Sequence, residues 1–278
     1  HIDFKAAIFT NFSQDHLDYH KTMKAYLNTK LTLFSKLLSS NSYIISDESN
    51  EQFLTLKKIA KKKNLRLKNI TKTISQIKNI PSSPLEYFQK KNLSMAILAA
   101  KLCGLKNVKL KKTLKKIKNI NGRLELIKKF PNNVKVFIDY AHTPDALFEV
   151  IKSIRDSYGS KISLVFGCGG ERDFKKRPLM AKIAKLYCKK IYVTDDNPRK
   201  ENPASIRKEI TNNLKGSIYF NIGNRSKAIK QAIFNAEPYE IVLVAGKGHE
   251  NYQDYGNKII SISDKEIVKK LNIKKNTI

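Results

Sequence analysis

Four short stretches of this sequence are rich in charged and polar side chains, two of them also contain glycine, and each directly follows an apolar run. They are "DYAHTPDAL" (139–147), "FGCGGERD" (166–173), "TDDNPRKE" (194–201) and "VAGKGHE" (244–250). Taken singly, each has an ordinary reading as a turn, with Asx geometry in "DNP" and positive φ at the glycines. A glycine-rich turn can also bind phosphate, and Arg offers two parallel donors to a carboxylate. The recurrence of the pattern favours a binding site for an anionic ligand.

A second group of polar residues lies near the start of the chain. "SQDHLDYH" (13–20) places His16 and His20 among Asp15 and Asp18, and Lys30 follows in the next predicted helix. An acid–histidine cluster of this kind can cap a helix, and a lone His is usually structural. Imidazole and carboxylate beside a nucleotide can alternatively hold Mg²⁺. The residues leave both interpretations open.

Regular elements must position these four polar stretches. Apolar runs predict strands at 134–139, 162–166, 190–194, 217–220 and 240–244. Between them, helical periodicity predicts helices at 144–157, 177–188, 203–214 and 224–235. Strands alternating with helices indicate an α/β, Rossmann-like domain with a mainly parallel sheet covered on both faces. In such a sheet the four stretches converge at the carboxyl ends of the strands, where ligands bind.

The first part of the chain predicts a different arrangement. Strands are expected at 5–10 and Tyr43–Ser46, helices at Thr22–Leu38, Glu51–Lys63, Leu85–Leu102 and Leu110–Ile117, and an edge strand or hairpin at Arg66–Lys78. The "PSSP" at 81–84 predicts a loop. Gly104 ends the helix predicted over Leu85–Leu102. We place a domain boundary near Asn121, which gives one domain over 1–121 and a second over 122–278.

Composition narrows the classes of function. The 278 residues carry a formal charge of +30, but only eight of the 54 basic residues are Arg. The lysines are spread along the chain and do not cluster with aromatic residues, so we expect anionic small-molecule ligands and no nucleic acid.

No long apolar run or leader is evident, which predicts no membrane insertion. The three cysteines have no pairing or metal spacing, which favours a reducing, cytoplasmic compartment.

Six ordered blocks then resemble a known family over nearly the whole chain. They are "TNFSQDHLDYHKTMKAYLNTKLTLF" (10–34), "NGRLE" (121–125), "DYAHTPDAL", "FGCGGERDFKKRPLM" (166–180), "DDNPRKENP" (195–203) and "VAGKGHENYQ" (244–253). In order and spacing these blocks resemble the Mur ligases, and most closely the MurE type. The resemblance implies that 1–121 is the second half of the central ATPase domain and 122–278 the amino-acid-binding domain. The family's first domain and P-loop are not recognisable in these residues, so the chain is expected to be inactive alone.

The resemblance also implies a reaction in peptidoglycan synthesis, and hence a part in cell-wall biogenesis, cell shape and cell division. ATP phosphorylates the side-chain carboxylate of D-Glu in UDP-MurNAc-L-Ala-D-Glu, and the amine of meso-diaminopimelate attacks the acyl phosphate. Mg²⁺ and cationic side chains offset the crowded anionic oxygens. A monomer is expected. The alternatives are another amide ligase, such as MurF or folylpolyglutamate synthase, and a remnant that binds diaminopimelate or nucleotide without turnover.

The resemblance assigns nucleotide, metal and catalytic roles to particular positions. Lys30 matches the lysine that carries a CO₂-derived carbamate (N6-carboxylysine), and with His16 it would hold Mg²⁺. Arg123, Asp139 and His142 match ATP contacts. Lys30, His142 and Arg123 are the expected catalytic residues.

The resemblance further identifies the site for meso-diaminopimelate. This amino acid carries a second carboxylate at its far end that L-lysine lacks, and reading that carboxylate requires a fixed cation. "DNPR" supplies Arg199 for this purpose, and Glu250 suits the distal ammonium. The expected contacts are Arg172, Asp196, Asn197, Pro198, Arg199, Gly246 and Glu250.

Overall fold

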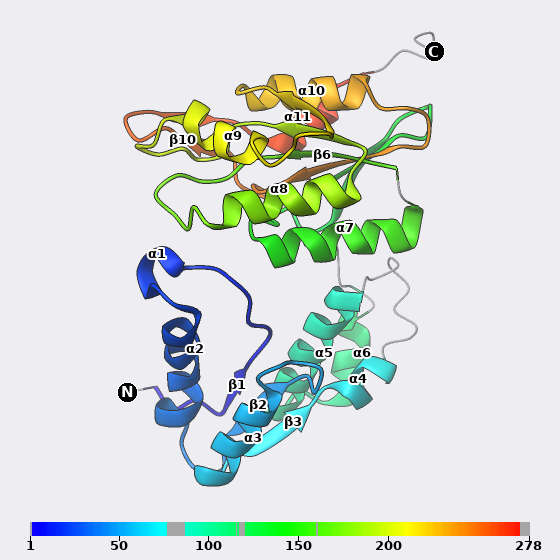
Figure 1. Cartoon of the computed structure of the whole chain (residues 1–278). Helices are drawn as coiled ribbons and strands as arrows, with labels where there is room; N and C mark the ends of the chain where they lie inside the picture. The colour runs from blue at the N-terminus through cyan, green and yellow to red at the C-terminus, as the bar shows by residue number, and fades with distance from the viewer. Residues whose placement is uncertain (1, 77–86, 115, 117–119, 160, 273–278) are drawn as a thin grey trace. The chain divides into compact units, whose positions relative to one another are not determined.

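The computed structural model describes residues 2–76, 87–114, 116, 120–159 and 161–272 (Figure 1). The chain divides into two compact units. The first contains His1–Ser13 and Tyr19–Lys118, and the second contains Gln14–Asp18 and Asn119–Ile278.

A small parallel sheet forms the centre of the first unit. Its strands are β1 (Ala6–Ile8), β2 (Tyr43–Ser46) and β3 (Arg66–Asn69), in the order β1-β2-β3. Side chains alternate between the two faces of a strand. Accordingly Ile44 packs with Phe34 and Leu56, whereas its neighbour Ile45 packs with Ile70 and Met95. Both isoleucines are fully buried, which gives the sheet a core on each face.

The helices of the first unit largely match the predicted ones. Thr22 caps the helix that follows it, accepting a hydrogen bond from the Ala25 amide at 3.1 Å. The predicted helix 22–38 is realised as α2 and a π-helical turn directly after it. The helices are α1 (Leu17–His20, across the division between units), α2 (Met23–Thr32), the π-helical Leu33–Leu37, α3 (Phe53–Lys62), α4 (Thr71–Gln76), α5 (Tyr87–Leu102) and α6 (Asn107–Leu114).

Two predictions in this unit need correction. The segment expected to be a strand or hairpin over Arg66–Lys78 is a strand only as far as Asn69, at the edge of the sheet, and then becomes α4. The side chain of Asn69 ends the strand by accepting a hydrogen bond from the Thr71 amide at 3.2 Å. The helix expected from Leu110 begins at Asn107. The predicted loop at 81–84 and the first two residues of the helix predicted from Leu85 lie outside the described residues.

The sheet of the second unit confirms the predicted α/β architecture. Its order is β4-β5-β9-β6-β7-β8, and every pair from β5 to β8 is parallel. β4 joins β5 as an antiparallel edge strand. The bounds are β4 (Glu125–Lys129), β5 (Lys135–Asp139), β6 (Ile162–Phe166), β7 (Lys190–Val193), β8 (Ile218–Asn221) and β9 (Ile241–Ala245).

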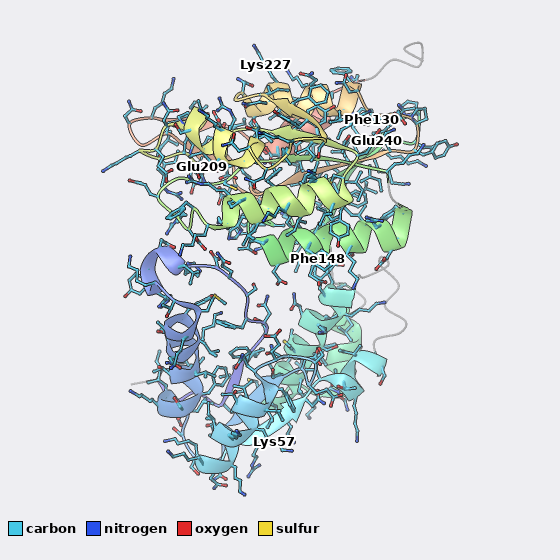
Figure 2. The ribbon with its side chains drawn as sticks, in the orientation of Figure 1. Lys57, Phe130, Phe148, Glu209, Lys227 and Glu240 are labelled. Atoms are coloured by element: carbon cyan, nitrogen blue, oxygen red, sulfur yellow. The ribbon has the colours of Figure 1, made fainter. Side chains whose placement is uncertain are left out.

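Helices cover both faces of this sheet. Figure 1 shows α10 (Arg225–Phe234) and α11 (Asp264–Lys270) on one side, and α7 (Pro144–Tyr158) and α8 (Lys176–Tyr187) on the other. α9 (Pro203–Thr211) packs beside α8. The ring of Phe148 on α7 lies 5.5 Å from that of Tyr187 on α8, and Figure 2 labels Phe148. On the other face, Val242 and Val244 pack with Ile229 of α10.

Three elements of the second unit were not predicted: β4, the antiparallel hairpin of β10 (Tyr252–Asp254) and β11 (Ile259–Ser261), and α11. Strands of three residues are too short to display a period, and α11 has only seven residues. Within the described part of the chain, no helix has the length and apolar character needed to cross a membrane.

Candidate functional site

The four polar stretches meet at one edge of the second unit's sheet, as predicted. They follow β5, β9, β6 and β7, which are neighbours in that order and run parallel. The carboxyl ends of these strands therefore bring the loops after Asp139, Ala245, Phe166 and Val193 side by side.

The glycines after β6 allow two of these loops to pack backbone to backbone. A Cβ atom on Gly167 would lie 2.2 Å from the Thr194 carbonyl oxygen, and one on Gly170 would lie 2.0 Å from that of Pro198. The Gly170 amide donates to the Asn197 carbonyl at 2.9 Å. Neither predicted interpretation, a simple turn or a phosphate cradle, included this close contact, which fixes the "DNPR" loop against its neighbour.

Arg199 is held at this contact by its backbone and its side chain. Its φ of +51° is in the left-handed region, and its amide donates to the Asp254 carbonyl at 2.9 Å. Nη1 donates to the Gly170 carbonyl at 2.7 Å, and Nε lies 3.9 Å from Asp254 Oδ2. Among the described residues these contacts use Nη1 and Nε, which leaves Nη2 available to an anion. The side chain is 25% exposed, so a ligand can reach it.

A buried polar cluster joins the "DNPR" loop to the loop after β9. Lys247, whose side chain is 1% exposed, donates from Nζ to Asn197 Oδ1 at 2.9 Å and to Glu250 Oε2 at 2.7 Å. Asn197 Nδ2 donates to the same Glu250 oxygen at 3.2 Å. Burial disfavours the Glu250 carboxylate, but Lys247, Asn197 and Tyr140 together outweigh burial and lower the pKa of Glu250.

Asp196 and Gly246 lie against each other beside this cluster. The Asn197 amide donates to Asp196 Oδ1 at 2.7 Å, and a Cβ on Gly246 would lie 2.8 Å from Asp196 Oδ2. Gln253 reaches across from β10, donating to the carbonyls of Asp195 and Asp196 at 3.0 and 2.9 Å. The loop after β7 is therefore held by contacts on two sides, which fixes the position of the Asp196 carboxylate.

A buried ion pair lies beneath the same loops. Arg225 of α10 donates from Nε and Nη2 to the two carboxylate oxygens of Asp264, at 2.8 and 2.7 Å, and both side chains are at most 1% exposed. Arg225 Nη2 also donates to the Ala245 carbonyl at the end of β9, at 3.0 Å. The pair supports the backbone from which the loop after β9 begins.

The candidate nucleotide residues lie around the end of β5. Asp139 is buried, and its two oxygens accept hydrogen bonds from the Leu124 and Ala141 amides at 2.6 and 2.7 Å. Burial raises the pKa of Asp139, and these bonds partly oppose the shift. Arg123 is exposed, and its guanidinium lies 4.4 Å from the centre of the Tyr140 ring. Asp139 thus positions the loop that presents Arg123.

His142 has a defined tautomer in this arrangement. Its Nδ1 lies 2.8 Å from the Tyr140 carbonyl, which only accepts, so Nδ1 carries the proton. Nε2 lies 3.7 Å from Asp15 Oδ2, within the segment Gln14–Asp18 of the same unit. Burial opposes ionisation of Asp15, yet the adjacent His142 side chain and the charge of Lys176 contribute to lowering the pKa of Asp15 to about 2.

The remaining predicted residues lie at the margins of this site or outside it. Arg172 is half exposed, with Nη1 at 3.6 Å from Asp18 Oδ2, and Pro198 is buried with its carbonyl against Gly170. His16 lies in the second unit and Lys30 in the first, where its ammonium is 4.9 Å from the Tyr26 ring centre. Within the described ranges, no group of three or more His, Cys, Asp or Glu residues is arranged to hold a metal ion.

The parallel sheet with its charged carboxyl edge defines the second unit as a Rossmann-like α/β domain. Residues 1–109 match the profile of the Mur ligase middle domain, and residues 122–248 match that of the Mur ligase glutamate ligase domain. The chain belongs to the Mur ligase family.

Relatives and solved structures agree with this membership. The UDP-N-acetylmuramoyl-L-alanyl-D-glutamate--2,6-diaminopimelate ligase of Rickettsia typhi is 38% identical over 288 residues, covering 94% of this chain and 57% of the relative. A solved structure of a ligase with that name is 29% identical with a TM-score of 0.52, covering 96% of this chain and 60% of the other. Mycobacterium tuberculosis folylpolyglutamate synthase shares the fold, with 14% identity, a TM-score of 0.68 and coverages of 87% and 61%. The chain therefore spans about three fifths of the length of each.

Proposed function

We propose that this chain forms part of an ATP-dependent ligase that adds meso-diaminopimelate to UDP-MurNAc-L-Ala-D-Glu during peptidoglycan precursor synthesis. In this proposal, 1–121 belongs to the central ATPase domain and 122–278 is the amino-acid-binding domain. The enzyme acts as a monomer in the cytoplasm, where free Cys103, Cys168 and Cys188 stay reduced. One observation carries the proposal: Arg199 is fixed at the sheet edge, next to Asn197 and a carboxylate at Glu250.

The far end of meso-diaminopimelate is a zwitterion, and this edge offers complementary charges. Arg199 Nη2 suits the distal carboxylate, and Glu250 suits the distal ammonium. Arg172, half exposed on the neighbouring loop, provides a second cation, whereas Asp196, Pro198 and Gly246 shape the backbone around the ligand. At its distal end L-lysine carries only the ammonium, so Arg199 Nη2 would have no ligand carboxylate to bind.

The nucleotide is proposed to bind at the loop after β5. Arg123 is exposed and suited to phosphate oxygens, His142 offers Nε2, and Asp139 retains a lone pair on each oxygen for a ribose hydroxyl. A related fold, the folylpolyglutamate synthase of Yersinia pestis, was crystallised with AMPPNP and a Mn ion, which supports ATP and a divalent cation here. At 14% identity, that protein is similar to this chain in fold alone.

The proposed chemistry is acyl transfer through an acyl phosphate. The D-Glu carboxylate of the substrate takes the γ-phosphoryl group, and the amine of diaminopimelate then displaces phosphate, losing a proton as the amide forms. Arg123 would offset the negative charge on the phosphoryl oxygens, and His142 would do so as the imidazolium, with a second proton on Nε2. Imidazole at His16 and a carbamate on Lys30 are suitable ligands for Mg²⁺, which supplies further charge neutralisation when bound.

We expect the unmodified 278-residue chain to bind meso-diaminopimelate more tightly than L-lysine, because only diaminopimelate has a distal carboxylate that can bind Arg199. Isothermal titration calorimetry with each amino acid measures both affinities directly. Equal affinity for the two would contradict the proposed specificity, and the absence of binding to either would contradict the amino-acid site itself.

The same 278 residues are expected to show no measurable ATP turnover with UDP-MurNAc-L-Ala-D-Glu and meso-diaminopimelate. They include no G-x-x-x-x-G-K-[ST] loop to cradle the phosphates. Release of phosphate, followed with a coupled assay, tests this expectation. Robust turnover would show that other residues bind the nucleotide, whereas amino-acid binding without turnover supports the proposal.

A further inference from the structure

Lys247 has a position that its sequence context did not reveal. It lies in "VAGKGHE" between the two glycines, and its side chain is 1% exposed although it carries a charge. Its ammonium donates to Asn197 Oδ1 and to Glu250 Oε2, and lies 5.2 Å from the Tyr252 ring centre. A buried ammonium requires such partners, because burial without them would strongly disfavour its charge.

The contacts of Lys247 fix the orientation of the Asn197 side-chain amide. The atom of Asn197 that faces Lys247 also accepts from the Asp254 backbone amide at 3.0 Å. An ammonium and a backbone N–H can only donate, so the atom between them must be the amide oxygen. Nδ2 is therefore directed to Glu250, and the group that Asn197 can still offer a ligand is an N–H donor.

The same contacts divide the two oxygens of Glu250. Oε2 accepts from Lys247 Nζ at 2.7 Å and from Asn197 Nδ2 at 3.2 Å. Among the described residues, Oε1 has a single long contact, of 3.4 Å, with the Tyr140 hydroxyl. Oε1 thus keeps the capacity to accept a hydrogen bond from a ligand ammonium.

We propose that Lys247 is a positioning residue of the amino-acid site, which holds Asn197 as a donor for the ligand's distal carboxylate and Glu250 as an acceptor for its distal ammonium. This inference rests on the proposed function. Lys247 is not expected to touch the ligand itself, because its side chain is 1% exposed and its ammonium donates to Asn197 and Glu250. Its role is to orient Asn197 Nδ2 on the loop after β7 and Glu250 Oε1 on the loop after β9, so that together they match the zwitterionic end of the ligand.

The charges around Glu250 predict the effect of neutralising Lys247. Lys247 adjoins Glu250 on its own loop, Tyr140 faces it from the end of β5, and the charges of Asp196 after β7 and Arg225 of α10 act in the same cluster. With Lys247 present, the pKa of Glu250 is below its ordinary value of 4.5, so the carboxylate persists across neutral pH. Without Lys247, the carboxylate loses its main stabilising contact while burial still disfavours it, and the pKa of Glu250 rises. Ligand binding is then lost as the pH falls through that raised pKa.

The test is the Lys247→Met variant, with Lys200→Met as the matched control. Lys200 is exposed and adjoins Arg199, so its substitution removes the same charge near the site without entering the cluster. Calorimetry with meso-diaminopimelate from about pH 5.5 to about pH 8.5 is expected to show at least a roughly tenfold loss of affinity for Lys247→Met at the acidic end, recovering as the pH rises. The unmodified chain and Lys200→Met should give flat profiles. A Lys247→Met profile parallel to that of the unmodified chain would overturn the inference.

A second measurement does not depend on the ligand or on the variant's folding. A carbon-13 NMR titration of the Glu250 carboxyl in the unmodified, ligand-free chain should give a pKa below the ordinary glutamate range. A value above that range would overturn the role assigned to Lys247. Failure of the unmodified chain to bind meso-diaminopimelate would instead contradict the proposed function, while this titration still decides whether Glu250 is held as a carboxylate.

Discussion

Replacing Arg199 with alanine is expected to abolish the preference for meso-diaminopimelate over L-lysine, chiefly by weakening the binding of diaminopimelate. The lost interaction is a hydrogen bond between two charged groups in a partly buried site, which contributes about 2–3 kcal/mol. Affinity for diaminopimelate should therefore fall by roughly 30- to 150-fold. Affinity for L-lysine should change little, because its distal end has no carboxylate to lose a partner. Calorimetric titration of both ligands into both proteins gives the comparison.

The structure supplies controls that separate this effect from damage to the loop. Alanine at φ +51° carries a backbone cost similar to that of arginine, and the substitution also removes the hydrogen bond from Nη1 to the Gly170 carbonyl. A distorted loop would weaken the binding of both amino acids, since Asn197 belongs to the same backbone segment. Arg199→Lys keeps the charge but not the second parallel donor, so it should retain part of the preference. An Arg199→Ala protein that still prefers diaminopimelate would contradict the role proposed for this residue.

The sheet of the second unit was predictable because its strands are buried and its helices are long. Apolar runs such as Ile241–Val244 read as strands wherever they pair, and α7 repeats its apolar positions over fifteen residues. The missed elements gave weak or conflicting local signals. β4 reads "ELIKK" and is recognisable only through its antiparallel pairing with β5. The strand or hairpin predicted over Arg66–Lys78 wrongly included 71–76, because the capping contact of Asn69 was not recognised.

The location of the candidate site could be predicted, but its internal contacts could not. Loops that follow parallel strands must share an edge, so four stretches could be placed together from their positions alone. Lys247 stood within one of them, yet in a chain so rich in lysine its charge gave no sign of burial. Its importance depends on Asn197, fifty residues away in sequence. The pairing of Arg225 with Asp264 spans 39 positions and has no local pattern at all.

Removing Asp264 is expected to destabilise the second unit by about 3–5 kcal/mol, because Arg225 would remain buried with an uncompensated charge. Asp264→Ala deletes both acceptors of the guanidinium, and the carbonyls of Ala245 and Asp195 are not enough to replace a carboxylate. Urea unfolding, monitored through hydrogen exchange at the β9 amides, reports the stability of this unit. Diaminopimelate binding should weaken as well, since Arg225 supports the end of β9 just before Gly246.

Two further variants test whether the cost arises from the unpaired charge. Glu266→Ala changes an exposed acid on the same helix, paired with Lys269 at 3.2 Å, and should cost less than about 1 kcal/mol. Arg225→Met combined with Asp264→Leu removes both buried charges, and apolar replacements of a buried pair are often close to neutral, within about 1–2 kcal/mol. The double variant should therefore be more stable than Asp264→Ala alone. If it is equally unstable, packing around α11 is responsible, and the buried charge of Arg225 does not explain the loss.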